Sequence, residues 1–337
     1  MKIAIGRTTR NHCFTNLWIE YCQNNNIDFK LVDIYANNII DQVSDCTGFM
    51  WHHSHADYRD ALFSKQLIYS IEAKGIKVFP NFETTWHFDD KVGQKYLLEA
   101  IKAPFVKTYV FYMEADALDW IDTTIFPKVF KLRGGAGSAN VKLIIKKKQA
   151  VKLVRKAFGK GFHQFDRFEN LRVRYLKWRT DKRMLTGLLK GIGRLFIEPE
   201  FSKVRSREKG YVYFQDYIPN NSCDIRIVVV DDKAFGLKRL VRRNDFRASG
   251  SGDILYDKMQ IDERCVEIAF EVNKKIKSQS IAFDFVFDQN NNPLILEISY
   301  GFTAQAYEQC EGYWDQKMNW HQGKNFNFCA WMVNQVL

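Results

Sequence analysis

The sequence predicts mixed α and β structure: an α/β segment with a small parallel sheet, then an α+β segment that is interrupted by a basic helical insert. Three observations support this. Short apolar strands alternate with helices over about the first 100 residues, pairs of strands joined by short polar turns follow residue 210, and one stretch between them carries the whole net charge. These features predict a multidomain chain without membrane spans or repeats.

Length and composition agree with this fold class. The chain has 337 residues and 39.6 kDa, with 46% hydrophobic and 15% aromatic residues, which is enough for a substantial core. Met1 to Gly6 has the pattern of a strand and not of a signal peptide. Seven scattered cysteines form no CxxC pair and no zinc spacing, which favours reduced thiols in a cytosol. We therefore expect a soluble cytoplasmic protein.

In the first hundred residues, alternation of strands and helices predicts a parallel sheet. The stretch Phe14–Cys22 has the pattern of an amphipathic helix. A helix is also expected over Tyr69–Lys74, ending near Gly75. The expected strands are Lys2–Gly6, Phe29–Ile34, Gly48–Trp51 and Lys77–Phe79.

The later part of the chain has the pattern of antiparallel strands. The turns Asp231–Asp232 and Asn290–Asn292 fit hairpin loops, and Asp262–Ser278 has an apolar face at helical spacing. The expected strands are Val129–Leu132, Val212–Tyr217, Ile225–Val230, Ala234–Arg242, Ala282–Asp288 and Leu294–Ile298.

The positive charge is concentrated between residues 151 and 210. This stretch has 17 Lys and Arg against six Asp and Glu, whereas the formal net charge of the entire chain is +11. Apolar residues recur at helical spacing over 185–196, which predicts an amphipathic helix. The stretch is interpreted either as a solvated insert or as a surface for an anionic partner. An anionic membrane is favoured over nucleic acid, because no nucleic-acid-binding motif accompanies the charge.

A glycine-rich segment follows the strand that ends near Lys131 and Arg133. It contains Gly134, Gly135, Gly137 and Ser138. Backbone N–H groups of such a loop can approach phosphate oxygens, and a neighbouring lysine adds positive charge. The segment is neither a P-loop nor a dinucleotide fingerprint, since GK[ST] and GxGxxG are both absent. A purely structural loop is the alternative.

A second basic cluster follows Cys223-Asp-Ile-Arg226. Strand alternation places Asp224 and Arg226 on one face, with Lys238 downstream. Arg247 precedes another glycine-rich segment and can bind a terminal phosphate through its planar guanidinium group.

Two acidic residues interrupt apolar strands: Asp284 in Phe-Asp-Phe and Glu297 in Leu-Glu-Ile-Ser299. A buried carboxylate is costly unless it is paired or binds a metal. Because the two strands are joined by a short hairpin, both acids can point to one place. Carboxylate oxygens suit Mg²⁺ bridging a nucleotide triphosphate, and salt bridges to Arg226, Lys238 or Arg247 are the alternative.

Two further clusters have less specific patterns. His52, His53 and His55 with Asp57 allow a zinc site, although substrate contact at the end of a strand is favoured. Four aromatic residues near the C-terminus fit either a wall beside an acceptor or a packed core: Tyr313, Trp314, Trp320 and His321.

In this order, from Asp89 to Tyr300, the motifs resemble the ATP-grasp superfamily, which includes glutathione synthetase, D-alanine–D-alanine ligase and the ribosomal-protein glutamate ligases. The resemblance implies two α+β subdomains that clamp ATP, preceded by a Rossmann-like domain. The residues after Ile298 look like the branch associated with bacterial surface-polysaccharide biosynthesis. The implied domains are residues 1–100 (Rossmann-like), 101–214 (small subdomain with the insert 151–210) and 215–337 (C-terminal subdomain with the metal site).

The resemblance also implies roles for residues. Lys91 and Lys131 look like the lysines that contact ATP, together with the glycine segment and Lys238, and Asp224 resembles the residue near the ribose. Phe214-Gln-Asp-Tyr-Ile218 is similar to the hinge that contacts adenine, so Gln215, Asp216, Tyr217 and Ile218 are assigned to it. Arg226 and Arg247 match the catalytic phosphate clamps. Asp284, Glu297 and Ser299 match the ligands of Mg²⁺, with Mn²⁺ as an alternative, and Ser299 stands where the family usually has Asn.

The expected function is that of an ATP-dependent carboxylate–amine ligase, acting through an acyl phosphate on a small or sugar-linked acid, with a nucleotide-sugar or lipid-linked sugar as partner. Alternatives are a ligase that adds amino acids to a protein, a degenerate ATP-grasp scaffold that binds an anionic surface through residues 151–210, and a kinase. The protein is expected in the cytoplasm, with peripheral contact to the inner face of the membrane and an oligomeric state left open.

Overall fold

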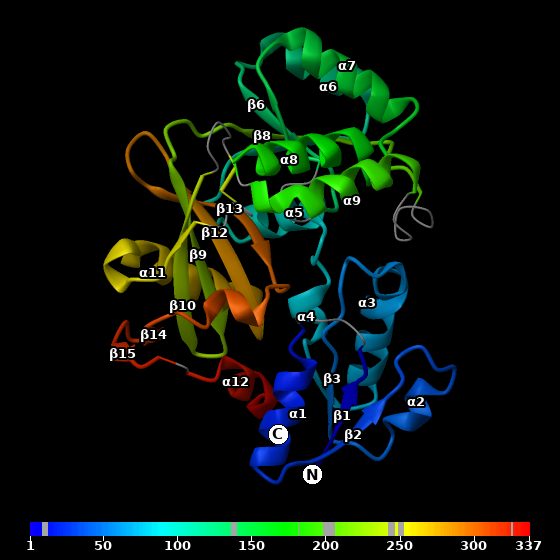
Figure 1. Ribbon diagram of the computed structural model, residues 1–337, viewed down its shortest axis with the longest axis vertical. Coiled ribbons are helices and arrows are strands. Elements are labelled where there is room, and N and C mark those ends of the chain that lie inside the picture. Colours follow the sequence, from blue (N-terminus) through cyan, green and yellow to red (C-terminus); the bar gives the residue numbers. More distant parts are fainter. Residues whose placement is uncertain are drawn as a thin grey trace.

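The computed structural model describes residues 1–8, 13–135, 140–180, 182–197, 206–241, 247–248, 253–324 and 326–337. It contains three sheets (Figure 1). The first is parallel, as predicted, and has the strand order β2-β1-β3-β4. Its strands are β1 (Lys2–Gly6), β2 (Asp28–Val32), β3 (Gly48–Met50) and β4 (Lys77–Phe79), and its helices are α1 (Thr15–Asn24), α2 (Ile39–Gln42) and α3 (Tyr58–Ala73).

Helix α3 is longer than the sequence pattern indicates. The expected helix started at Tyr69, but α3 begins at Tyr58, where Asp57 is the N-cap. The Asp57 side chain accepts a hydrogen bond from the Arg59 backbone N–H at 2.9 Å, which satisfies one of the N–H groups left open at a helix start. The capping residue therefore sets this boundary, and the apolar spacing alone does not reveal it.

The second sheet is antiparallel with strand order β5-β8-β6-β7 and has its own core. Two helices, α4 (Phe82–Thr85) and α5 (Lys91–Ala100), lead into it. The predicted boundary between the two later domains, at 214/215, stays a prediction. It falls inside strand β8. The elements are β5 (Thr108–Phe111), α6 (Glu114–Thr123), β6 (Lys128–Lys131), β7 (Lys142–Ile144), α7 (Lys147–Phe158) and β8 (Val212–Asp216).

The third sheet has seven strands in the order β13-β12-β9-β10-β14-β15, with β11 paired to β10. The predicted strands and the predicted helix are present, and β14 and β15 were not predicted as strands. The elements are β9 (Cys223–Val230), β10 (Lys233–Leu240), β11 (Ile254–Leu255), η2 (Lys258–Gln260), α11 (Glu263–Ile276), β12 (Ser280–Phe287), β13 (Pro293–Ser299), η3 (Ala304–Tyr307), β14 (Gly312–Asp315), β15 (Trp320–Gln322) and α12 (Phe328–Asn334).

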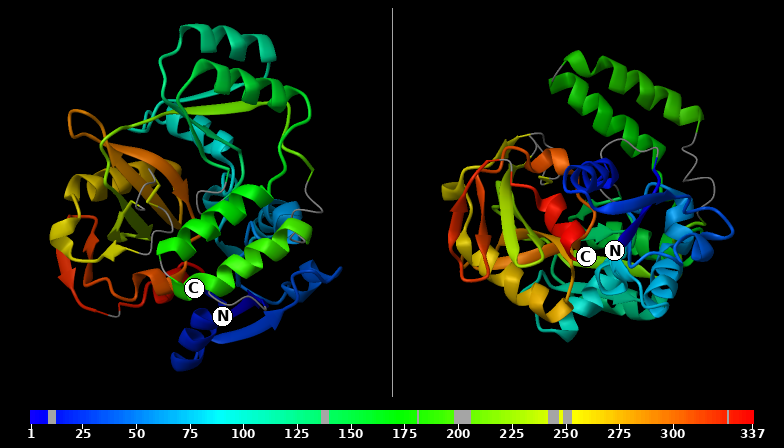
Figure 2. Two further views of the ribbon diagram at one scale, coloured as in Figure 1. Left: turned by 45° about the horizontal axis from the view of Figure 1, so that its top comes forward. Right: turned by 90° about the horizontal axis from the view of Figure 1, so that it is seen from below.

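The first and third sheets share one hydrophobic core. Ile3 and Trp18 from the N-terminal segment, Phe235 from β10 and Met332 from α12 belong to a single buried cluster. Figure 2 shows both chain termini in this part of the molecule, with α12 beside α1. The N-terminal segment therefore packs on the C-terminal sheet, whereas the second sheet buries its apolar residues separately.

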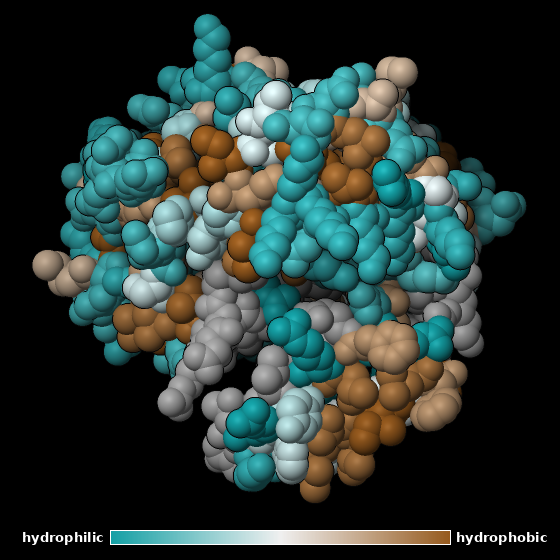
Figure 3. Space-filling view, turned by 90° about the horizontal axis from the view of Figure 1, so that it is seen from above, coloured by the Kyte–Doolittle hydropathy of each residue, from teal (hydrophilic) through white to brown (hydrophobic). Residues whose placement is uncertain are grey.

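A helical hairpin projects from the second sheet. It consists of α8 (Arg167–Thr180), η1 (Lys182–Met184) and α9 (Leu185–Phe196), and α9 matches the predicted amphipathic helix. Hydrogen bonds from Arg167 Nη1 to the Leu195 carbonyl and from Arg174 Nη1 to the Gly187 carbonyl, both 2.9 Å, show that the helices are antiparallel. Figure 3 shows a hydrophobic patch on this hairpin, at the lower right of the view.

Candidate functional site

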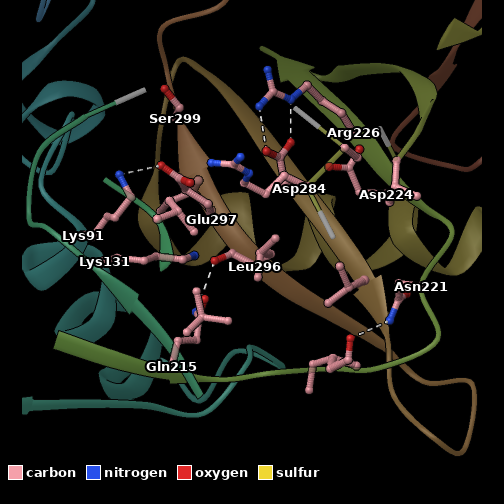
Figure 4. A pocket seen from close by; sticks show the side chains of 18 of the residues that line it. Lys91, Lys131, Gln215, Asn221, Asp224, Arg226, Asp284, Leu296, Glu297 and Ser299 are labelled. Atoms are coloured by element: carbon pink, nitrogen blue, oxygen red, sulfur yellow. Dashed lines mark hydrogen bonds and ion pairs between the residues drawn. The ribbon is translucent and has the colours of Figure 1, made fainter. Parts of the chain in front are cut away.

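A cavity of about 230 Å³ lies between the second and third sheets (Figure 4). Most residues that the sequence assigned to a nucleotide site line it, although they come from distant parts of the chain. They are Lys91, Lys131, Gly135, Gln215, Asp216, Tyr217, Ile218, Asp224, Arg226, Arg247, Asp284, Glu297 and Ser299.

Strand pairing brings the acidic residues of the cavity together. Strand β12 lies between β9 and β13, and in its register Asp284 is opposite Arg226 on one side and opposite Glu297 on the other. Because residues that face each other across a ladder point to the same face of the sheet, these three side chains line one wall. The register shifts directly after Asp284.

Asp284 is held by two arginines. Its carboxylate accepts hydrogen bonds from Arg226 Nε at 2.5 Å and Nη2 at 2.7 Å, and Arg239 Nη2 lies 2.9 Å away. Burial alone would raise the pKa of Asp284, but the two guanidinium groups hold it well below its ordinary range. The carboxylate is therefore ionised and fixed in orientation.

Arg239 also pairs with Asp224. Its Nε and Nη2 atoms each donate to an Asp224 oxygen at 2.7 Å, and both residues are buried. Burial and the charge of Asp284 raise the pKa of Asp224, whereas Arg239 lowers it. The two acids and two arginines thus form one network in the cavity wall, and its arginine Nη atoms add positive charge beside Asp284.

Glu297 has a different partner. Lys91 Nζ lies 3.1 Å from Glu297 Oε1 and also donates to the Gly135 carbonyl at 2.8 Å. The Lys91 backbone N–H donates to the Arg133 carbonyl at 3.0 Å. Lys91, the first residue of α5, therefore ties the start of the glycine segment to β13. Next along β13, Ser299 Oγ interacts with the Gly301 backbone.

Lys131 enters the cavity from strand β6 and is 5% exposed. Burial lowers its pKa to about 8, and Glu297 and Asp284 oppose this while Lys91 adds to it. A buried cation that lacks a close ion pair in the described chain is costly. An incoming anion of high charge would relieve that cost.

The hinge residues of strand β8 connect the two sheets. Gln215 Nε2 donates to Thr108 Oγ1 at 3.1 Å and to the Leu296 carbonyl at 3.3 Å. Its Oε1 is buried without a hydrogen-bond partner among the residues that the structure describes. Asp216 pairs with Lys128 Nζ at 2.5 Å. Gln215 therefore offers an acceptor in the wall of the cavity.

Four predicted site residues are placed elsewhere or not described. Lys238 does not line the cavity: its Nζ contacts Gln260 at 3.3 Å, because strand alternation turns it to the face opposite Arg239. Gly134 lines a second cavity and not this one. Gly137 and Ser138 lie outside the described residues.

Sequence reasoning missed Arg239, Lys128 and Asp89. Asp89 Oδ1 accepts the Gly135 N–H at 2.6 Å, so it fixes the start of the glycine segment. Strand alternation could have identified Arg239, since it is opposite Asp224 in the register of β9 and β10. Lys128 and Asp89 gave no such signal, because their partners are distant in sequence.

A second cavity, of about 630 Å³, lies on the other side of the glycine segment. His53, His55 and Lys65 of the N-terminal part line it, together with Arg133 and Tyr211 of the second sheet. Lys65 makes no ion pair or hydrogen bond in the described part of the chain, and burial lowers its pKa. Among the described residues no cluster of three His, Cys, Asp or Glu side chains suits a metal, which does not support zinc at the histidines.

The aromatic residues near the C-terminus are packed against the sheet. Trp314 is fully buried and lies edge-on to Trp320 at 4.5 Å, and Tyr313 stacks on His321 at 4.9 Å. None of the four lines either cavity. The packed interpretation therefore holds for Trp314, whereas His321 is exposed.

The cavity between the sheets fits a nucleotide triphosphate with a divalent cation. Lys131 and Lys91 supply positive charge, and Gln215 Oε1 supplies an acceptor suited to an amino group of a base. Asp284 and Glu297 are two carboxylates on facing strand positions. Because Mg²⁺ is commonly held by one or two carboxylates plus phosphate oxygens and water, the donor set fits that ion when phosphate is present.

Comparison with known proteins agrees with this architecture. Residues 199–313 match the family model of the RimK-like ATP-grasp domain. No curated protein matches the chain by sequence. Within the described ranges, no helix has the length and hydrophobicity needed to cross a membrane.

Solved structures resemble the chain over its whole length. A RimK domain ATP-grasp protein from Sphaerobacter thermophilus has a TM-score of 0.58 at 13% identity, covering 100% of this chain and 99% of its own. D-alanine–D-alanine ligase from Bacillus anthracis complexed with ATP has 0.58 at 13%, covering 100% and 96%. The ATP-grasp ligase PsnB, complexed with minimal precursor, Mg and ADP, has 0.55 at 10%, covering 99% and 98%.

The fold therefore belongs to the ATP-grasp class. Over residues 199–313 the sequence is similar to the RimK-like ATP-grasp domain, and over the whole chain the likeness to the solved structures is one of fold.

Proposed function

We propose that this protein is an ATP-dependent carboxylate–amine ligase. One observation carries the proposal: Lys91 and Lys131 on one side of the cavity face Asp284 and Glu297 on the other. Lys91 is in α5, which precedes the second sheet, and Lys131 is in β6 of that sheet. Asp284 and Glu297 are in β12 and β13 of the third sheet. Such a cavity holds phosphates between cations and a metal-binding pair of acids, which is what phosphoryl transfer needs.

Different residues of the cavity would bind ATP, the metal and the transferring phosphoryl group. Lys131, Lys91 and the backbone at Gly135 would bind the phosphates of ATP, and residues 215–218 would bind the adenine. Asp284 and Glu297 would hold Mg²⁺ or Mn²⁺, with Ser299 beside them. When bound, the metal supplies charge neutralisation between the phosphates. Arg226 and Arg247 would bind the transferring phosphoryl group, and Arg226 is already aligned by its two bonds to Asp284.

The chemistry follows from the low reactivity of a carboxylate towards an amine. A carboxylate oxygen of the substrate attacks the γ-phosphorus of ATP, ADP leaves, and an acyl phosphate forms. The amine nitrogen then attacks the acyl carbon, phosphate leaves with the C–O bonding pair, and a proton is released from nitrogen. Arg226, Arg247 and Lys131 would stabilise the charge that moves between the two phosphates. No covalent bond to the protein is needed.

The second cavity supports a site for the acid. It adjoins the same glycine segment through Gly134, and Lys65 and Arg133 line it. Lys65 lacks an ion pair among the described residues, so an anionic substrate would give it one. Lys65→Met is expected to raise the KM of the acid at least tenfold, with the Kd of ATP unchanged. Lys74→Met, at the end of the same helix, serves as the matched control.

The biological setting is also a proposal. The likeness of the C-terminal sequence to the surface-polysaccharide branch supports a sugar-linked or small acid as substrate, with a nucleotide-sugar or lipid-linked sugar as carrier. Cytoplasmic ATP and the free thiols of the chain support a cytoplasmic location. The oligomeric state stays open, as does modification of a protein in place of a sugar.

A second candidate is a nucleotide-free ATP-grasp scaffold. It is favoured by two observations: both Asp284 oxygens already bond to arginines, and Ser299 replaces the usual Asn. Calorimetry with Mg–ATP separates the candidates, because a scaffold of this kind would bind no nucleotide.

The ligase proposal is tested by a screen of amino acids and uronate sugars for ADP production. We expect turnover only when an acid and an amine are both present, with a mass gain equal to the two substrates less water. Asp284→Asn and Lys131→Ala should abolish turnover. Unchanged turnover in Asp284→Asn would contradict the metal role, and absence of Mg–ATP binding in the wild type would contradict the ligase.

A further inference from the structure

Helix α9 of the hairpin exposes a continuous apolar stripe. Leu185, Leu189, Ile192 and Phe196 recur at spacings of four, three and four residues, so they lie on one face of the helix. All four are exposed, and Leu189 and Phe196 keep 58% and 83% of their surface. Leaving such side chains in water forfeits the stabilisation that burial would give.

Helix α8 exposes a second stripe of mixed character. Phe168, Arg172, Tyr175 and Arg179 follow the same spacing and are all exposed, with Phe168 at 74%. Two aromatic rings thus alternate with two guanidinium groups. Aromatic side chains and arginines of this kind are typical of helices that lie in a membrane interface.

Both stripes lie on the same side of the hairpin. The helices contact each other through Leu171 and Arg174 on α8 and through Gly187 and Gly191 on α9. At about 100° per residue, the α8 stripe is displaced from this contact by roughly 100° and the α9 stripe by roughly 150°, in the same rotational sense. Because the helices are antiparallel, rotation in the same sense turns both stripes to the same side of the hairpin, and the α9 stripe points further away from the partner helix.

A glycine makes this close packing possible. A Cβ atom at Gly191 would lie 2.7 Å from Arg174 Cδ and 3.3 Å from Leu171 Cδ1. The two helices therefore pack closely against each other, and the outer face of the hairpin presents the stripes. The exposed apolar residues therefore belong to no core shared with another described element.

The hairpin is strongly basic. Residues 167–197 include nine Lys or Arg and two Asp or Glu. Lys190 and Arg194 are exposed on α9, and Lys182 lies over the Trp178 ring at 3.8 Å. The charged side chains that the structure describes on the hairpin are thus all basic, and Arg172 and Arg179 lie within the α8 stripe itself.

From these features we infer that the outer face of the hairpin docks onto an anionic lipid bilayer. The apolar stripe of α9 enters the interface, and the exposed arginines of the α8 stripe, Arg172 and Arg179, contact acidic headgroups. A second copy of this chain fits the face less well, because pairing two such faces would bring two sets of nine cations together. Nucleic acid would leave the apolar stripe exposed. The inference goes beyond the proposed ligase activity and does not depend on it.

Co-sedimentation of the full chain with vesicles tests the inference. The vesicles are pure phosphatidylcholine or phosphatidylcholine with 30% phosphatidylglycerol. We expect binding to the anionic vesicles at least tenfold tighter than to the neutral ones, weakening with salt. The double variants Leu189→Glu with Ile192→Glu, and Arg172→Glu with Arg179→Glu, should each weaken that binding at least tenfold.

Ile125→Glu and Met259→Glu are controls, because Ile125 and Met259 are apolar residues outside the hairpin that are even more exposed than Leu189 and Ile192, at 83% and 84%. They should bind vesicles as the wild type does. Circular dichroism and thermal melting confirm that each variant is folded. Equal binding to neutral vesicles, wild-type binding by either hairpin variant, or a dimer that Leu189→Glu with Ile192→Glu dissociates would overturn the inference.

Discussion

The cavity between the sheets and the helical hairpin both concentrate charged residues, but in opposite ways. In the cavity wall Asp284, Asp224, Arg226 and Arg239 are each within hydrogen-bonding distance of an opposite charge. In the hairpin, nine cations stand against two acids, and five of the seven cations whose side chains the structure describes are exposed. The first arrangement fixes side chains in orientation, and the second produces an extended field of one sign.

The charges in the cavity wall and those of the hairpin therefore have different physical effects. Buried pairs perturb pKa values and depend on each partner, so each change there should be costly. Exposed charges act together and at longer range, so single changes should have little effect on stability. The following predictions test this contrast, from the largest expected effect to the smallest.

The largest effect is expected at Asp284. Asp284→Asn should abolish ATP turnover and lower the free energy of unfolding by about 3 kcal/mol, because it leaves Arg226 and Arg239 buried with less charge to balance them. Denaturant unfolding and the ADP assay measure the two effects. The facing variant Glu297→Gln should also abolish turnover but cost less than about 1 kcal/mol, since Glu297 is partly exposed. Equal losses in the free energy of unfolding for Asp284→Asn and Glu297→Gln would contradict the expected difference between the two acids.

Lys131→Met should separate stability from binding. We expect at least tenfold weaker ATP binding together with greater stability at pH 7, because a buried cation is replaced by an apolar chain of similar length. The folded-state pKa is lowered, so the unfolded chain binds more protons between about pH 8 and 10.5, and the gain should disappear as the pH rises through that window. A gain that persists at pH 10.5 would contradict this origin.

Nucleotide binding should be linked to a proton at alkaline pH. In the free protein Lys131 is mostly neutral at pH 9, since burial lowers its pKa to about 8. Bound phosphates favour the charged lysine, so ATP binding at pH 9 should take up about one proton. Calorimetry in two buffers of different ionisation enthalpy measures the uptake. Lys131→Met should show none, and uptake that survives in this variant would assign the proton to another group.

His87 predicts a smaller effect, on acid stability. The ring is fully buried, neither nitrogen has a hydrogen-bond partner in the described chain, and burial lowers its pKa to about 4. The unfolded chain therefore binds more protons between pH 4 and about 6.5, and stability should fall with falling pH by up to about 1.4 kcal/mol per unit. His87→Phe should flatten this slope in unfolding measured from pH 7 to 5. An unchanged slope would exclude His87.

The smallest effect is expected in the hairpin. Arg179→Gln should change the free energy of unfolding by less than about 0.5 kcal/mol, because the side chain is exposed. A loss as large as that of Asp284→Asn would show that the hairpin charges are also structural.

Much of the fold could be predicted from the sequence, because strand length and alternation are local signals. The strands around Asp284 and Glu297, and the helix over 185–196, lie close to their predicted positions. The exclusion of Lys238 and the role of Arg239 depend on which face of β10 turns inward, and the apolar pattern there did not reveal it. Pairs such as Lys128 with Asp216 are set by tertiary packing, which no local pattern contains.

The separate core of the second sheet has a consequence for motion. Since the first and third sheets share their buried cluster and the second does not, residues 108–216 can rotate as a body without opening the larger core. Gln215 donates a hydrogen bond to the Leu296 carbonyl, so it lies at the point about which such a rotation would occur. Amide hydrogen exchange should then show two cooperative units, and the one that contains both chain ends should be the more protected. Motion of the other unit would carry Lys131 towards or away from Asp284 and Glu297.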